Sequence, residues 1–109
     1  VWEVGEGALR HYRLSPADAG LEPVAPGAIC SSDPQENARL LRSVLAGERG
    51  PLRTFVLLNA GAALVAAELA RDLREGVALA AEAVDSGAAA EKLERFVATT
   101  RELAETVSP

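Results

Sequence analysis

The spacing of apolar residues divides this 109-residue chain into a short hairpin followed by several helices. Residues 1–4 and 9–14 are short apolar runs on either side of the glycine-containing segment 5–8, which predicts an antiparallel hairpin over residues 1–14. Alternation along the strands predicts two faces, one with Trp2, Val4, Tyr12 and Leu14 and the other with Glu3, His11 and Arg13. A two-stranded hairpin is marginally stable in water, and no later segment has the pattern of a strand. The hairpin therefore requires a sheet that this sequence does not contain.

Helix-start signals recur through the rest of the chain. Ser15 followed by Pro16 predicts a short helix over residues 16–19, and residues 20–32 have the composition of a loop. Asp33 before a proline, Gly50 before a proline, and Asp72 each mark the start of a longer helix. The predicted long helices cover about residues 34–46, 51–70, 73–85 and 88–107.

The helical segments differ in how much of their surface is apolar. Segment 51–70 is apolar nearly all round, which predicts a helix buried on most sides at the centre of the core. Within it, Gly61 and the neighbouring alanines form a surface that another backbone can approach closely. Segments 73–85 and 88–107 each have a single apolar stripe. The chain is predicted to be mostly α-helical.

Composition excludes several classes of protein. With 49% hydrophobic and 25% charged residues, the chain has the composition of a globular domain and not of a disordered one. Its net charge of −5 argues against nucleic acid as a partner, and its single cysteine excludes an internal disulfide or a multi-thiolate metal site. The uncharged stretch 54–67 is too short to span a membrane, and no export signal is present, so we expect a cytoplasmic protein. The chain begins with Val1 and contains no methionine, which either an excised initiator or an origin within a longer protein would explain.

Three features near the amino terminus could be mistaken for sites. His11 has no second imidazole to work with, so we interpret it as a surface or packing residue. Cys30 has no base nearby in the sequence and is interpreted as a passive thiol. The segment Gly5-Glu6-Gly7 is followed by a strand, whereas a phosphate loop needs a helix N-terminus, so a turn is the better interpretation.

The start of helix 51–70 is the better candidate for anion binding, because Arg49 and Arg53 flank a helix N-terminus. The preferred interpretation is a connector between helices with solvated arginines. Asn59 is the one polar residue of an apolar stretch and needs a hydrogen-bond partner wherever it is buried, so we interpret it as a structural tie to a neighbouring backbone group. The acids of the last helix are too dispersed for a paired-carboxylate site and are expected to be solvated: Glu91, Glu94, Glu102 and Glu105. The residues therefore predict no catalytic, cofactor-binding or metal-binding site in this chain.

Five segments resemble a known family in order and with compatible spacing. They are Asp33-Pro34-Gln35-Glu36-Asn37-Ala38, Gly50-Pro51-Leu52-Arg53, Val56-Leu57-Leu58-Asn59-Ala60, Glu75-Gly76-Val77-Ala78-Leu79-Ala80 and Asp85-Ser86-Gly87. Together they resemble the carboxyl-terminal end of anthranilate phosphoribosyltransferases, and the hairpin with Leu14-Ser15-Pro16 resembles the family's strand–strand stretch. The chain departs from the family pattern at Thr54-Phe55, Gly61 and Ala88-Ala89-Ala90.

The resemblance implies an α/β fold in the full-length protein, with residues 1–109 forming the C-terminal part of the phosphoribosyltransferase domain and the hairpin completing its sheet. Enzymes of this family transfer phosphoribosyl from phosphoribosyl pyrophosphate to anthranilate in tryptophan biosynthesis, with Mg²⁺, and are homodimers when complete. Their glycine-rich loop, anthranilate-contacting arginine and Asp-Glu metal pair all precede the matched stretch. The resemblance therefore implies that this chain holds no ligand for Mg²⁺, needs the missing N-terminal portion as its partner, and is inactive alone.

A different class of protein is also consistent with the residues. The chain could be a non-catalytic helical interaction module, related to the family, that binds another protein through the exposed edge of its hairpin. Some relatives of the family are thought to bind nucleic acid, but the net charge of −5 and the single lysine, Lys92, argue against that here.

Overall fold

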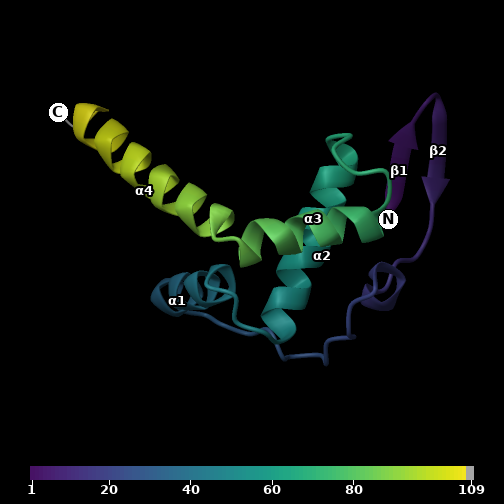
Figure 1. Ribbon diagram of the computed structural model, residues 1–109, viewed down its shortest axis with the longest axis horizontal. Coiled ribbons are helices and arrows are strands. Elements are labelled where there is room, and N and C mark those ends of the chain that lie inside the picture. The colour runs from purple at the N-terminus through teal and green to yellow at the C-terminus, as the bar shows by residue number, and fades with distance from the viewer. Residues whose placement is uncertain (108–109) are drawn as a thin grey trace.

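The computed structural model describes residues 1–107 and contains a hairpin followed by helices (Figure 1). The elements are β1 Trp2–Gly5, β2 Ala8–His11, the 3₁₀-helix η1 Pro16–Ala19, α1 Pro34–Leu45, α2 Pro51–Ala66, α3 Leu73–Asp85 and α4 Ala88–Val107. The predicted mostly helical chain with an N-terminal β-hairpin is confirmed. α1 ends one residue earlier than predicted and α2 ends four residues earlier.

The turn of the hairpin contains only two residues, Glu6 and Gly7. Both have positive φ angles, 48° and 74°. Two central residues with positive φ are typical of a type I′ turn, whose twist matches that of the strands it joins. This turn fixes the antiparallel register as Trp2 opposite His11, Glu3 opposite Arg10, Val4 opposite Leu9, and Gly5 opposite Ala8.

The predicted faces of the hairpin were wrong for the second strand. Directly opposed residues of an antiparallel pair lie on the same face, so His11 lies with Trp2. Tyr12 lies instead with Glu3, to which its hydroxyl donates a hydrogen bond of 2.9 Å. The prediction placed β2 one residue out of register, which is enough to exchange its two faces.

Side-chain caps begin two of the helices, as the sequence predicts. The Asp33 carboxylate accepts a hydrogen bond of 3.0 Å from the Gln35 backbone N–H at the start of α1. The Asp72 carboxylate accepts one of 2.9 Å from the Glu75 backbone N–H at the start of α3. Each cap satisfies a backbone donor that has no partner within its own helix.

The early end of α2 is caused by Glu68, which adopts the left-handed conformation with φ of 61°. The chain then folds back so that the backbone N–H groups of Leu69 and Ala70 both donate to the Leu64 carbonyl, at 2.9 and 3.3 Å. This is the geometry of a helix C-cap, in which glycine is the usual residue. The sequence has no glycine or proline at this point to indicate the end of the helix, and the helix was therefore predicted to extend to residue 70.

The crossing of α2 and α3 forms the centre of the core. Gly61 and Gly76 meet there so closely that a Cβ atom on Gly76 would lie 2.4 Å from the Gly61 carbonyl oxygen. The predicted close approach of a backbone to Gly61 is therefore confirmed. The buried apolar residues of this core come from both helices and from η1: Ala19, Leu57, Val77, Ala80 and Val84.

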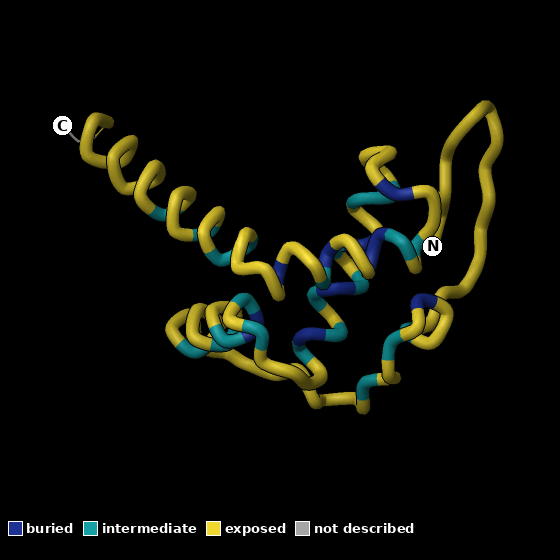
Figure 2. Tube along the Cα trace, viewed as in Figure 1, coloured by how far each residue is buried: buried dark blue, intermediate teal, exposed yellow. Residues whose placement is uncertain are grey.

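Exposed residues predominate along the chain outside this core (Figure 2), and many large apolar residues are among them. The prediction that α2 is buried on most sides was wrong, because only Arg53, Leu57 and Gly61 of its residues are buried and Phe55 is 53% exposed. α4 points away from the other elements in Figure 1 and has no buried residue. Within residues 1–107, α4 contacts only α3 and α1 among the elements, and much of its apolar stripe and of the outer side of α2 stays exposed.

Candidate functional site

On the hairpin, His11 packs against an aromatic ring. The imidazole stacks on the Trp2 indole with ring centroids 4.0 Å apart and an interplanar angle of 14°. Both residues are exposed. The interpretation of His11 as a surface packing residue agrees with this geometry.

The opposite face of the hairpin carries a small polar cluster. The Glu3 carboxylate accepts hydrogen bonds from the Arg10 guanidinium at 2.8 Å and from the Tyr12 hydroxyl at 2.9 Å. Both hydrogen bonds lower the pKa of Glu3, and the bond from Arg10 has the larger effect. Because all three groups are exposed, the cluster ties β1 to β2 and encloses no reaction space.

Arg53, one of the two arginines proposed for anion binding, is engaged within the protein. It is only 6% exposed, and its Nη1 and Nη2 atoms donate to Oδ1 and Oδ2 of Asp85, each at 2.9 Å. This is the bidentate arginine–carboxylate geometry. Arg53 lowers the pKa of Asp85, and the nearby Arg49 adds to the effect.

The interpretation of this segment as a connector with solvated arginines was therefore wrong for Arg53. The guanidinium faces a carboxylate at the C-terminal end of α3 and not the solvent. An anion at the start of α2 would have to compete with Asp85 for it. Arg49 is exposed, as predicted.

Cys30 lies on the rim of an apolar groove with a volume of about 410 Å³. The groove runs between the loop 28–31, α1 and α2. Its lining is mostly aliphatic and aromatic, and comprises Ala28, Ile29, Cys30, Ser31, Glu36, Asn37, Leu40, Leu41, Leu52, Phe55 and Val56. None of these lining side chains is cationic, so the groove gives no reason to change the interpretation of Cys30 as a passive thiol.

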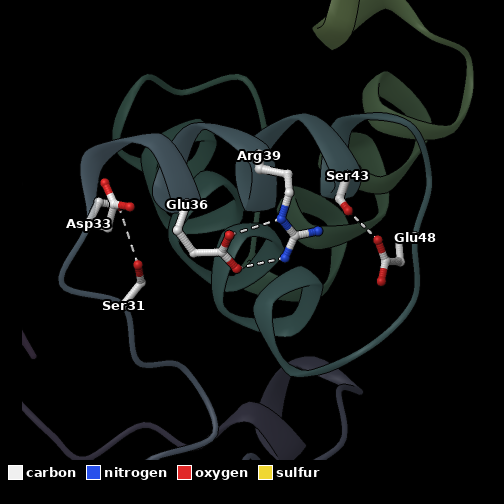
Figure 3. Close-up of polar contacts among 6 residues, drawn as sticks. All are labelled: Ser31, Asp33, Glu36, Arg39, Ser43 and Glu48. Atoms are coloured by element: carbon white, nitrogen blue, oxygen red, sulfur yellow. Dashed lines mark hydrogen bonds and ion pairs between the residues drawn. The ribbon is translucent and has the colours of Figure 1, made fainter.

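Polar side chains also gather along α1 (Figure 3). The Glu36 carboxylate accepts hydrogen bonds of 2.6 and 3.0 Å from the Arg39 guanidinium, which lowers the pKa of Glu36. Ser43 donates to Glu48, and Ser31 donates to the Asp33 carbonyl at 3.4 Å. All of these contacts are exposed and join residues close in sequence, so they support the helix locally and define no site.

The remaining candidates are also exposed. Asn59 lies on an exposed face of α2, and its amide donates to the Phe55 carbonyl of the same helix, at 2.8 Å. The predicted hydrogen bond to a neighbouring backbone group is thus present. Among the acids of α4, Glu94 forms an ion pair with Arg42 of α1. Because the two residues are 52 positions apart, no local pattern indicates this pair.

A second groove, which the sequence did not indicate, separates the hairpin from the turn between α2 and α3. Its volume is about 790 Å³. Charged residues of both signs line it, among them Glu3 and Arg10 from the hairpin and Arg71 and Glu75 from the helical side. Arg71 and Glu75 pair with each other at 2.7 Å.

Within residues 1–107, no three or more His, Cys, Asp or Glu side chains are grouped closely enough to hold a metal ion. None of the helices in that range has the length and hydrophobicity needed to cross a membrane.

Comparison with known proteins identifies the class to which this fold belongs. The glycosyl transferase family, a/b domain, matches residues 1–90, and the chain belongs to this family. The chain is also similar to anthranilate phosphoribosyltransferases. It is 48% identical to the one from Thermomicrobium roseum over 112 residues, which cover 100% of this chain and 32% of that protein.

Two other relatives give the same picture. The anthranilate phosphoribosyltransferase of Anaeromyxobacter sp. is 52% identical over 101 residues, covering 93% of this chain and 30% of that enzyme. The anthranilate phosphoribosyltransferase of Myxococcus xanthus is 52% identical over 92 residues, which cover 84% of this chain and 27% of that protein. The family resemblance drawn from the five segments is confirmed, and the chain spans only 27–32% of the length of these relatives.

Proposed function

We propose that this chain is the C-terminal segment of an anthranilate phosphoribosyltransferase and serves as part of its scaffold. The observation that carries the proposal is the identity of 48–52% with such enzymes across 84–100% of the chain. Identity at this level, continuous over the hairpin and the helices, supports a common fold and a common role for the segment.

The exposed surfaces support a scaffold role. Every residue of β1 and β2 is exposed, and Trp2 and Val4 are 65% and 81% exposed. Two unpaired strand edges and an apolar face are the features by which a hairpin joins a larger sheet. In the complete enzyme, the rest of the α/β domain would cover this face together with the outer side of α2 and the stripe of α4.

The chemistry of the proposed enzyme lies in the rest of the protein. The complete enzyme would transfer phosphoribosyl from phosphoribosyl pyrophosphate to anthranilate in the cytoplasm, as a homodimer. Magnesium would neutralise charge on the pyrophosphate, but the described residues offer no cluster that fits the ion. This segment would contribute packed helices, held by the Gly61–Gly76 contact and the Arg53–Asp85 pair.

A chimaera tests the proposal. The matching segment of the Thermomicrobium roseum enzyme is replaced by this chain, and consumption of anthranilate is followed by its fluorescence. We expect activity of the same order as that of the parent enzyme, and none from a truncated enzyme that lacks the segment. An Arg49→Ala chimaera should match the unmodified chimaera, because this exposed side chain is assigned no role in binding phosphate.

The alternative, a non-catalytic module that binds another protein through the hairpin edge, is favoured by the same unpaired strand edges. The chimaera separates the two functions. A module that has diverged from the enzyme scaffold would give a folded chimaera without activity. The net charge of −5 supports neither a nucleic-acid-binding version of the module nor one that binds an anionic membrane.

A further inference from the structure

We draw no further inference here: the strongest candidate, the apolar stripe of α4 that includes Phe96, Leu103 and Val107, is an unpartnered helix face, and nothing in the described part of the chain shows what covers it.

Discussion

Among individual residues, Arg53 and Asp85 carry the main long-range polar contact of the chain. The pair joins the first turn of α2 to the last residue of α3, 32 positions away in sequence. Burying a guanidinium is costly unless a carboxylate accepts its hydrogen bonds. The Asp85 carboxylate therefore offsets the cost of burying Arg53. The sequence places Arg53 beside Arg49 and gives no sign of the distant carboxylate. For this reason the two arginines looked alike although their environments differ.

Asp85→Asn should therefore lower the free energy of unfolding, and the loss should depend on pH. Arg53 lowers the pKa of Asp85 below its ordinary value of 3.8 in the folded state, so the pair stabilises the fold above pH 3.8. The stabilisation disappears as the pH falls through the folded-state pKa. Urea unfolding at pH 7 should show the variant to be less stable than the wild type, with the gap closing towards pH 2.

The matched control is Glu36→Gln, which breaks an exposed pair with Arg39 on α1. At pH 7, Glu36→Gln should lower the free energy of unfolding less than Asp85→Asn does, because exposed ion pairs contribute little to stability. Equal losses from both variants would contradict the special role of the Arg53–Asp85 pair.

The glycine contact between α2 and α3 gives a second prediction. Alanine normally stabilises a helix interior by about 1 kcal/mol relative to glycine. At position 76, however, the new Cβ would lie 2.4 Å from the Gly61 carbonyl oxygen, which is backbone and cannot move aside. Gly76→Ala should therefore destabilise the fold by about 1–3 kcal/mol, measured by urea unfolding. A more stable variant would show that the helices do not meet at this point.

The helices and strands differ in how clearly the sequence marks their boundaries. Helix starts were predictable because Asp33 and Asp72 are side-chain caps and Pro34 and Pro51 fit the first helical position. The end of α2 was not, because Glu68 takes the left-handed conformation in which glycine is the usual signal. The hairpin was recognisable from its glycines, but its register depends on a two-residue turn, and an error of one position exchanged the faces.

Glu68→Gly should stabilise the end of α2. The left-handed conformation costs a residue with a Cβ about 1–2 kcal/mol, and glycine avoids this cost. Part of the resulting stabilisation is lost because glycine has greater conformational freedom in the unfolded chain. We expect an increase of about 0.5–1 kcal/mol in the free energy of unfolding. The control is Glu82→Gly on the exposed side of α3, which should cost about 1 kcal/mol. A loss of stability in both variants would contradict the assigned cap.

The stripe of α4 was predictable from its spacing, but its exposure was not. Leu103 is 58% exposed in this chain, whereas under the scaffold proposal it is covered in the complete enzyme. Leu103→Ala should thus change the stability of the chain alone by less than about 0.5 kcal/mol and that of the chimaera by about 2–5 kcal/mol. Thermal melting of both proteins checks this. Equal small effects would show that the stripe stays exposed in the enzyme.

On the scale of the whole molecule, the sequence predicted more of the fold class than of the packing. Helix caps, the hairpin and the five family segments identified a mostly helical chain that belongs to the glycosyl transferase family, a/b domain. The expected burial of α2 failed for a physical reason: an apolar pattern shows which face of a helix is favourably covered. It does not report whether the covering element belongs to the same 109 residues.

The kcat/KM of the chimaera for anthranilate tests the central claim most directly, because the chain is then measured together with the remaining part of a protein to which it is 48% identical. If this chain is the C-terminal scaffold of such an enzyme, kcat/KM will be of the same order as that of the Thermomicrobium roseum parent. A chimaera that folds and melts cooperatively but transfers no phosphoribosyl group to anthranilate would contradict the claim.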